Sequence, residues 1–305
     1  MKHSTTKPVN LIVLQSHFFG QEAEPIRLYD YAPSIFDQIH SRKGIKKAIK
    51  RGEILVNGQT CFDGYWLQPN DKIELVNLEL SPPKSYRYKL DVIFEDDDLA
   101  IINKPAGIST SGNLYKTIQN MLIDNLKLSL KHDALEWPRP VHRLDNQTSG
   151  LLIIAKTTRA SQNLTQQFEK KYICKTYHAI VLGTPETKGN ISTYISEKVA
   201  ITEYKVLTTI NSIKNETLSL LELSPKTGRT HQLRIHLSEL GFPILGDKLY
   251  GKEGLILKRK GLFLCSTGLN FTHPTSGKLL HFSIAVPMKF NTLLKREQTM
   301  WEKKN

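Results

Sequence analysis

The sequence predicts an α+β protein with two domains, the larger one built on a mixed, mainly antiparallel β-sheet flanked by helices and loops. Its 305 residues leave room for two domains. Strand candidates outnumber helix candidates, and the connections are too irregular for a regular βαβ winding. Residues 81–88 contain two prolines and few apolar side chains, as is typical of a linker. We therefore divide the chain into an N-terminal region (1–80), a linker (81–89), a main domain (90–293) and a frayed, charged tail (294–305).

The N-terminal region begins with a strand candidate at residues 11–14. A short helix is expected over 34–39 and a second over 41–51, in which Ile45, Ala48 and Ile49 share one face. The rest of the second helix carries no acidic residue, whereas a solvated face usually mixes both signs. A phosphate backbone would relieve the repulsion among its cations. We therefore expect a nucleic-acid backbone to contact these side chains: Arg42, Lys43, Lys46, Lys47, Lys50 and Arg51.

Gly52 can end the basic helix, and strand signals follow at residues 54–56 and 73–75. The pair Asn57-Gly58 after the first strand indicates a tight hairpin. Two small helices, one of them basic, followed by a hairpin resemble the small RNA-binding domain first seen in a ribosomal small-subunit protein. The resemblance covers residues 33–76 and implies a small α/β fold that binds RNA. It offers no residue for catalysis.

The main domain is predicted from strand and helix signals in irregular order. Its first two strands surround four acidic residues, 95–98, which a solvated hairpin turn explains better than a metal site, since no other ligands lie nearby in the sequence. Helices are expected over 118–126, over 160–168, and from Thr230 to a stop at Gly241. Strands are expected at residues 92–94, 99–102, 151–155, 175–182, 203–209, 218–223, 262–265 and 279–285.

The loop at residues 142–150 joins charged side chains to a rigid core. Arg143 and Asp145 precede a short apolar run, 151–155, whose branched side chains are typical of a buried strand. Loops held by a scaffold are where chemistry is usually placed. An ordinary surface ion pair would give the same local sequence, so the rest of the chain must decide between the two.

The composition favours a polyanionic partner. Lys and Arg number 42 against 29 Asp and Glu, a formal net charge of +13. This surplus favours nucleic acid over a protein that merely happens to be basic. Cys61, Cys174 and Cys265 stand far apart, which argues against a zinc knuckle or a disulfide framework and fits a reducing compartment. No apolar run has membrane-spanning length, and the N-terminus lacks a secretory signal. We expect a cytoplasmic monomer that does not bind a membrane.

The ordered set of segments in the main domain resembles the RluA-type pseudouridine synthases, which isomerise uridine in RNA. The resemblance spans roughly residues 90–290 and keeps the order of the family's motifs. The matching segments are Glu95-Asp96-Asp97, Asn103-Lys104-Pro105-Ala106-Gly107, His142-Arg143-Leu144-Asp145, Thr148-Ser149-Gly150, Lys175-Thr176-Tyr177-His178-Ala179, residues 227–236 and Gly246-Asp247.

The resemblance implies roles for several side chains of a catalytic domain at 90–293. Asp145 is the carboxylate that acts at C1′ of the uridine, and Arg234 keeps it ionised. Arg229 either shares that task or contacts a phosphate. Tyr177 stacks on the target base and assists proton transfer, while Arg143 fills the space that the flipped base leaves in the RNA. We also place His142, beside Arg143, on the RNA-binding surface.

The reaction breaks the N1–C1′ bond, turns the uracil and joins C5 to C1′, so no group or electron enters or leaves. We therefore expect no metal and no cofactor, and none of the common nucleotide or zinc motifs occurs in the sequence. Two pathways stay open, one through a covalent sugar ester and one through an eliminated glycal.

Two other functions remain as alternatives. A non-catalytic RNA-binding or ribosome-assembly factor could keep the same scaffold. A nuclease could use His142, His231 and His236, although such histidines are more often structural hydrogen bonders. The N-terminal domain favours large-subunit ribosomal RNA as the substrate, with transfer RNA second.

Overall fold

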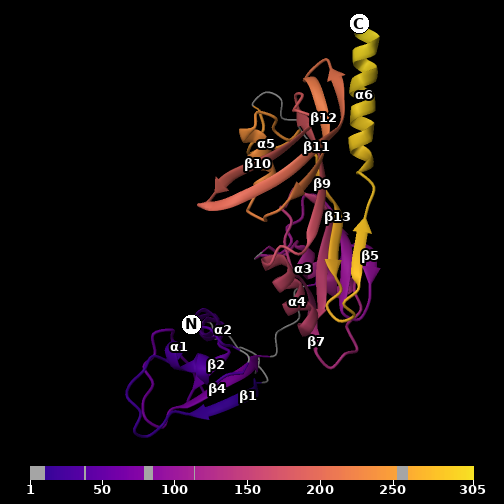
Figure 1. The fold of residues 1–305 in the computed structure, drawn as a ribbon. Helices are drawn as coiled ribbons and strands as arrows, with labels where there is room; N and C mark the ends of the chain where they lie inside the picture. Colours follow the sequence, from indigo (N-terminus) through magenta and orange to yellow (C-terminus); the bar gives the residue numbers. More distant parts are fainter. Residues whose placement is uncertain (1–10, 38, 79–84, 113, 253–259) are drawn as a thin grey trace, which may run out of the picture. The chain divides into compact units, whose positions relative to one another are not determined.

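The computed structural model describes residues 11–37, 39–78, 85–112, 114–252 and 260–305. The chain forms two compact units, Met1–Pro82 and Pro83–Asn305, drawn in sequence colours in Figure 1. Each unit has its own sheet and core and is described by itself. In the described ranges, no helix combines the length and the apolar character that crossing a membrane requires.

The smaller unit is built on a four-stranded antiparallel sheet with the order β1-β4-β2-β3. The hairpin between β2 and β3 turns at Asn57 and Gly58, whose φ angles of 52° and 77° suit this tight turn. The predicted strands at 11–14, 54–56 and 73–75 are confirmed, the first and last being longer than expected. The bounds are β1 (Leu11–Phe18), β2 (Ile54–Val56), β3 (Gln59–Thr60) and β4 (Lys72–Leu78).

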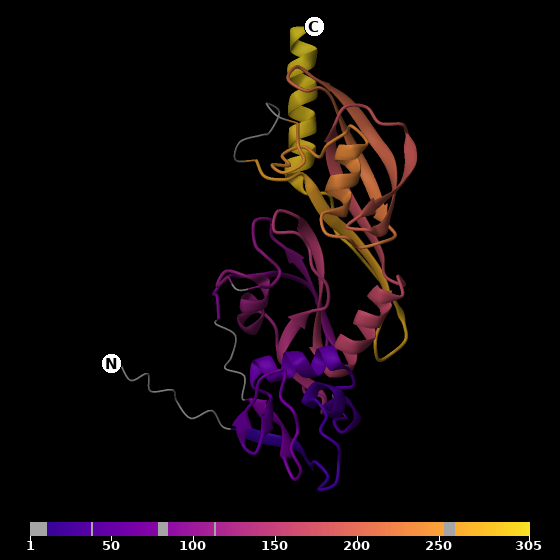
Figure 2. The ribbon, with the colours of Figure 1, turned by 90° about the vertical axis from the view of Figure 1, so that its left-hand side faces the viewer.

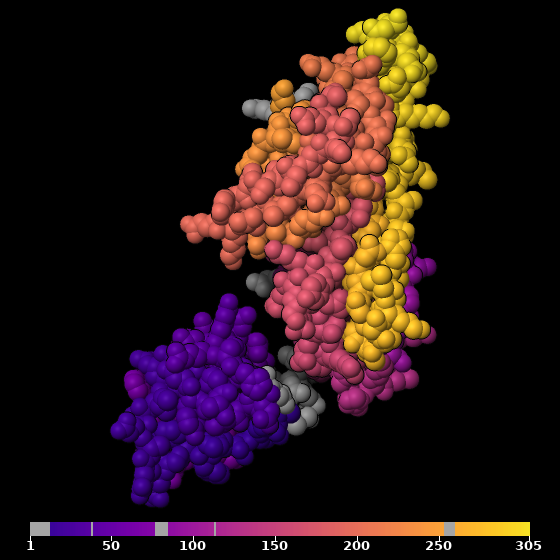
Figure 3. Space-filling view, viewed as in Figure 1, coloured from indigo at the N-terminus to yellow at the C-terminus, as the bar shows by residue number. Residues whose placement is uncertain are grey.

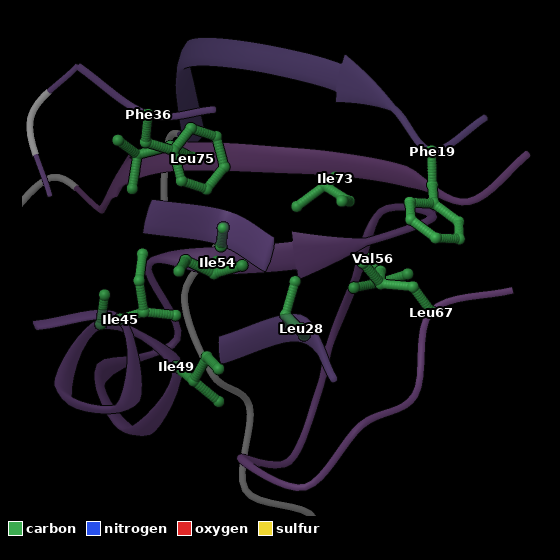
Figure 4. Packing of buried hydrophobic residues seen from close by; sticks show 12 residues of the cluster. Phe19, Leu28, Phe36, Ile45, Ile49, Ile54, Val56, Leu67, Ile73 and Leu75 are labelled. Carbon is green, nitrogen blue, oxygen red and sulfur yellow. The ribbon is translucent and has the colours of Figure 1, made fainter. Parts of the chain in front are cut away.

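The predicted basic helix is present as α2 (Arg42–Arg51). The Ser41 hydroxyl caps it by accepting a 3.1 Å hydrogen bond from the Gly44 amide, and Gly52 ends it with a left-handed φ of 75°. Its apolar stripe is buried in the core of the unit, where Figure 4 shows Ile45 and Ile49 beside Ile54 and Leu28. Burial of this stripe turns the basic face of the helix away from the core.

The prediction of a helix over residues 34–39 is wrong. The helical turns lie earlier, as α1 (Leu28–Tyr31) and the 3₁₀ turn η1 (Ala32–Ser34), and residue 38 lies outside the described ranges. Leu28, Ala32 and Phe36 are buried in one core at a spacing of four residues. The apolar period therefore begins six residues before the expected start, where Leu28 is its first buried member.

The larger unit contains a ten-stranded sheet with the order β10-β11-β12-β9-β13-β8-β6-β5, to which β14 and β7 attach at β13 and β8. Its strand pairs are antiparallel except β13 with β8, which confirms the predicted mixed, mainly antiparallel sheet. The bounds are β5 (Asp91–Glu95), β6 (Leu99–Lys104), β7 (Ala134–Pro140), β8 (Ser149–Thr157), β9 (Cys174–Leu182), β10 (Lys188–Ile195), β11 (Lys198–Ser212), β12 (Glu216–Pro225), β13 (Leu264–Thr272) and β14 (Leu279–Ser283).

Helices cover both faces of this sheet. Around β6 and β8, one core contains α3 (Ile118–Met121) and the turn η2 (Leu122–Asp124), and the other contains α4 (Thr158–Glu169). Around β9 and β12, α5 (Gln232–Glu239) and α6 (Met288–Lys304) lie on opposite sides of the strands, as Figures 1 and 2 show. Alternate residues of each strand therefore enter different cores.

The C-terminal segment corrects the expectation of a frayed tail at 294–305. It is the helix α6, which runs along the edge of the larger unit in Figure 3. Leu293 and Leu294 are buried in the core with Phe290. Farther along the helix, Glu297 accepts a 2.8 Å hydrogen bond from the Ser212 hydroxyl of β11. The high charge of this segment concealed its apolar stripe, which packs against residues of β9 and β12 in this core.

Candidate active site

A cavity of about 290 Å³ opens in the larger unit where three segments converge. They are the loop between β7 and β8 (141–148), the start of β9 with Lys175 and Tyr177, and the segment 225–234 that leads into α5. Asp145 and Arg234, which were predicted to act together, both line it. So do Arg143, Arg229, His142 and Tyr177.

Residues 104–110 hold the Asp145 loop in place through hydrogen bonds. The Thr110 hydroxyl donates to the Leu144 carbonyl (3.0 Å) and accepts from the Leu144 amide (3.2 Å). The buried Lys104 ammonium donates to the carbonyls of Ile108 (2.7 Å) and Asn146 (3.2 Å). These contacts lock the main chain on both sides of Asp145. The Asn-Lys-Pro-Ala-Gly motif and the three residues after it therefore position the loop.

The Lys104 ammonium is also one of the charges near Asp145. Burial lowers the pKa of Lys104 to about 8, and the Asp145 carboxylate opposes that shift by favouring the charged form. The buried Lys104 ammonium therefore interacts with the charge of Asp145, in addition to the groups that line the cavity.

Gly150 allows β8 to approach β13 closely. Its φ is +111°, and a Cβ atom there would lie 2.1 Å from the Ser266 carbonyl oxygen. No L-residue with a side chain fits without moving one of the two strands. Since Gly150 follows the Asp145 loop directly, this contact fixes where the loop leaves the sheet.

The Asp145 carboxylate faces two cationic or polar groups from the start of α5. Its Oδ2 lies 3.5 Å from Nη1 of Arg234, and its Oδ1 lies 3.8 Å from Nε2 of His231. The Asp145 side chain is 18% exposed, so it is reachable from the cavity while most of its surface is covered.

Arg234 is held mainly by the carboxylate of Asp247, a residue to which we had assigned no role from the sequence. Its Nε and Nη2 donate to Asp247 at 2.7 and 2.8 Å, and the amides of Leu249 and Tyr250 also donate to Asp247. Burial alone would lower the pKa of Arg234, but its hydrogen bonds to Asp247 hold it above the usual value. Burial would likewise raise the pKa of Asp247, yet the bonds from Arg234 and the two amides hold it low. Both groups therefore stay charged.

Tyr177 enters the cavity from β9, in register with Ser266 of β13. Burial raises the pKa of Tyr177 to about 12, and the negative charge of Asp145 acts in the same direction. Its phenol therefore keeps its proton at neutral pH. A protonated phenol can pack against a base and donate a hydrogen bond.

The three histidines of the motifs have different environments. Nε2 of His142 accepts a 3.0 Å hydrogen bond from the Ile153 amide, and burial, together with the charge of Lys175, lowers the pKa of His142 to about 3. His236 is fully buried, with Nδ1 3.0 Å from the Thr202 hydroxyl. His231 has a left-handed φ of 56°, and its Nδ1 lies 3.0 Å from the Tyr250 hydroxyl. Only His231 of these three faces Asp145.

Two of these environments bear on the earlier predictions. The neutral His142 ring cannot offer a positive charge to RNA, so its assignment to the RNA-binding surface stays a prediction without electrostatic support. The low pKa of His142 and the complete burial of His236 argue against a histidine-dependent nuclease.

The remaining predicted cations lie at different depths. Arg143 is exposed at the cavity, whereas Nε of Arg229 donates to the Val199 carbonyl at 3.2 Å. In the smaller unit, Arg42 and Arg51 of α2 pair with Asp30 and Glu53.

The third α2 cation with a partner is Lys46, whose ammonium lies 4.0 Å from the centre of the Tyr29 ring. The α2 cations without an ion pair or aromatic partner among the described residues are Lys43, Lys47 and Lys50.

The acidic residues 95–98 lie where β5 and β6 are joined in a hairpin, as predicted, but Asp98 is buried and not solvated. Oδ1 of Asp96 accepts from the amides of Asp98 and Leu99. The fold adds His273, which could complete a metal site with Asp96 and Asp98. However, Nδ1 of His273 accepts from the amides of Thr275 and Ser276, so Nε2 carries the proton and donates to Asp96 at 3.0 Å. Lys131 pairs with Asp98, and the cluster is explained as a structural ion-pair network.

The family whose model matches residues 98–239 is RNA pseudouridylate synthase. An uncharacterized RNA pseudouridine synthase of Aquifex aeolicus is 32% identical, over 90% of this chain and 95% of that protein. A ribosomal large subunit pseudouridine synthase C of Rickettsia felis is 34% identical, over 81% of this chain and 88% of that one. Human RNA pseudouridylate synthase domain containing 4 superposes with a TM-score of 0.55 and 26% identity, over 68% of this chain and 92% of that one.

The fold and the cavity thus define an RNA-modifying isomerase. The chain belongs to the RNA pseudouridylate synthase family, whose members convert uridine in RNA to pseudouridine. The resemblance found in its motifs is confirmed. The family assignment also favours the isomerase over a non-catalytic RNA-binding factor and over a nuclease.

Sequence analysis assigned no role in the isomerase to four residues that shape this site. Thr110 anchors the Asp145 loop, Asp247 orients Arg234, and His231 faces Asp145. Lys175 reaches into the cavity two residues before Tyr177. Of these, Lys175, His231 and Asp247 lie in segments that resemble the family, which was the available signal, but nothing in the local sequence distinguishes their contacts.

Proposed function

We propose that this chain isomerises uridine in large-subunit ribosomal RNA, with Asp145 as the carboxylate that acts at C1′. The observation that carries the proposal is the position of Asp145, in a cavity between the Arg234 guanidinium and the His231 imidazole and with Tyr177 on its wall. A carboxylate that accepts contacts from a guanidinium can attack C1′ or take a proton from the sugar. Both pathways left open by the sequence begin with this group.

Tyr177 and Arg143 are suited to two further parts of the reaction, the turning of the uracil and the extrusion of the base. Cleavage of N1–C1′ leaves the bonding electrons on the uracil, which turns and bonds to C1′ through C5. The hydrogen on C5 then leaves as a proton, and N1 gains one. The protonated Tyr177 phenol packs against the uracil as it turns. Arg143, exposed at the cavity, enters the RNA stack in place of the extruded base, whose unstacking costs about a few kcal/mol.

The cationic side chains of the two units have different roles in binding RNA. Within the cavity, Arg234 serves Asp145, and Arg229, whose Nε is already bound to Val199, contacts a phosphate. In the smaller unit, the basic face of α2 binds the RNA backbone. This assignment rests on the cluster of six cations on one short helix, three of which have partners within the protein.

The names of the relatives and the free cysteines support a particular substrate and a particular compartment. The Rickettsia felis relative, which is 34% identical, is named for the ribosomal large subunit. Ribosomal RNA is therefore the first substrate to test, and transfer RNA is the second. The three cysteines are free, in keeping with work in the cytoplasm. We expect the protein to act as a monomer, which light scattering would check.

The experiment compares total RNA from cells with the gene, without it, and with the Asp145→Asn variant. Pseudouridine is mapped by carbodiimide-dependent stops of reverse transcription. One or more stops should vanish without the gene and stay absent with the variant, because the amide neither attacks C1′ nor accepts a proton. Asp97→Asn, at an exposed position, is the matched control and should restore the stops. Normal stops with Asp145→Asn would refute the role of Asp145.

A further inference from the structure

The start of β9 brings a second cation to the wall of the cavity. Lys175 and Tyr177 are two residues apart on one strand, so both side chains point to the same face, and both line the cavity. The Lys175 ammonium extends to the segment 225–234 on the other side, where it donates to the Thr227 carbonyl at 3.2 Å. The side chain therefore reaches from β9 to the segment 225–234, and both residues of this contact line the cavity.

The protein satisfies only part of the hydrogen-bonding capacity of the Lys175 ammonium. A lysine has three N–H donors, and Thr227 accepts one of them. Among the described residues, no carboxylate lies within 4.0 Å of the Lys175 nitrogen. Among the other covered lysines of this unit, Lys156 pairs with Glu95 at 2.7 Å and Lys104 donates to three carbonyls. Lys289 also donates to one carbonyl, that of Leu262, but its ammonium lies over the rings of Phe263 and Phe290 as well.

Other groups near Lys175 do not compensate its positive charge. Its neighbour His142 is neutral and is disfavoured as a cation by Lys175, while Arg143 and Arg229 line the same cavity. Burial lowers the pKa of Lys175 without bringing it a counterion. Covering a cation without a partner costs free energy, which an anionic ligand can recover on binding.

Gly228 keeps space next to the ammonium. A Cβ atom at this position would lie 3.9 Å from the Lys175 nitrogen, the nearest atom it would meet. A longer side chain would extend farther from the main chain and crowd the ammonium. The glycine therefore leaves room for a ligand beside Lys175.

We infer that Lys175 binds a phosphate oxygen of the nucleotide whose base enters the cavity. The uracil ring is neutral, so the phosphates that flank the flipped nucleotide are the groups of this substrate that carry the missing negative charge. The subsite rests on the proposed function. It would hold the backbone of the flipped nucleotide while Asp145 meets its sugar, so that binding as well as catalysis depends on Lys175.

The test is a double-mutant cycle between protein and RNA. An RNA fragment with the mapped target uridine is made in three forms: unmodified, with one neutral methylphosphonate 5′ of that uridine, and with one 3′ of it. Binding of each to the wild type and to Lys175→Met is measured by filter retention. Methionine keeps the length of the side chain without its charge. Lys303→Met, an exposed site on α6, is the control, and thermal unfolding checks that each variant is folded.

Lys175→Met should weaken binding of the unmodified RNA about 10-fold or more, as expected for a hydrogen bond to a charged group. One of the two methylphosphonates should weaken the wild type by a similar factor. The same RNA should bind Lys175→Met without further loss. Lys175→Arg should retain most of the affinity, and Lys303→Met should behave as the wild type.

Two results would overturn the assignment. Unchanged affinity of a folded Lys175→Met would remove the subsite. Additive losses at both linkages would show that Lys175 contacts another group, such as a uracil carbonyl. Release of tritium from RNA labelled at uridine C5 is measured in parallel. If the wild type releases tritium but the effects of Lys175→Met and of either methylphosphonate are independent, the Lys175 subsite alone is refuted. If the wild type releases no tritium from any RNA, the proposed function is refuted, and the subsite with it.

Discussion

Arg234 donates two hydrogen bonds to Asp247, and this bidentate pair leaves its third nitrogen, Nη1, directed at Asp145. Both members of the pair are buried, with Arg234 5% and Asp247 1% exposed. The contact to Asp145 is longer, at 3.5 Å, than the two bonds to Asp247. The Asp247 carboxylate therefore orients the guanidinium, and the remaining nitrogen of Arg234 faces the Asp145 carboxylate.

Asp247→Asn should reduce kcat about 100-fold, since loss of the orienting carboxylate lets Arg234 shift by about an ångström. It should also destabilise the larger unit by about 3–5 kcal/mol, because a buried cation loses its partner. Urea unfolding and tritium release from labelled RNA measure the two effects. The double variant Arg234→Leu/Asp247→Leu separates them: stability should recover while activity does not. If activity also recovered, Arg234 would have no role at Asp145.

Gly150→Ala should fold poorly or lose activity, because its Cβ would lie 2.1 Å from the Ser266 carbonyl oxygen and its φ is +111°. The two strands that define one side of the Asp145 loop would have to separate. Solubility and the midpoint of thermal unfolding report this directly. Gly228→Ala is the matched control for stability, since its Cβ would meet nothing nearer than 3.9 Å. Equal midpoints for the two variants would contradict the close contact.

Thr110→Val should leave the fold intact and lower kcat more than it changes KM. The substitution keeps the shape of the side chain but removes both hydrogen bonds to Leu144, at a cost of about 1–3 kcal/mol. The main chain before Asp145 then gains freedom. Steady-state kinetics on the mapped RNA fragment measure kcat and KM, and Thr110→Ser should restore kcat. A pure KM effect would mean that Thr110 serves binding and not the position of Asp145.

His142 should make stability depend on pH in the acidic range. Its pKa is about 3 in the folded protein and 6.5 ordinarily, so between these values the unfolded chain binds a proton that the folded one does not. The free energy of unfolding therefore rises with pH across this window, by up to about 1.4 kcal/mol per pH unit. Urea unfolding between pH 5 and pH 7 should show a steeper fall toward acid for the wild type than for His142→Gln. The exposed His132→Gln is the control and should keep the wild-type slope.

The free cations of α2 should control the salt dependence of RNA binding. Replacing Lys43, Lys47 and Lys50 by Gln should flatten the plot of log affinity against log salt by about 0.7–0.9 per lost phosphate contact. Arg42→Gln should change it less, because Arg42 already pairs with Asp30 at 2.7 Å. Nitrocellulose binding at several salt concentrations gives the slopes. A slope unchanged in the triple variant would argue against backbone contact by α2.

The local elements were predictable because their signals lie within a few residues. Ser41, the stripe from Ile45 to Ile49, and Gly52 together specify α2, and Asn57-Gly58 specifies the hairpin. The strand after the Asp145 loop was equally clear, and β8 is confirmed. Where the signal was ambiguous, the prediction failed, as for α1, whose apolar period starts at Leu28, and for α6, whose charges conceal its buried stripe.

The α+β class, the basic helix and the family of the ordered motifs could all be predicted from the residues alone. Each of these depends on residues close together along the chain or on the order of short segments. The contacts of the site could be read only from the folded chain: Asp145 with His231 and Arg234, Arg234 with Asp247, and Leu144 with Thr110. These contacts join residues far apart in sequence, and they form because the packing of β8, β9 and α5 places their ends at one cavity. No local pattern encodes such a contact, since its geometry exists only when the sheet is assembled.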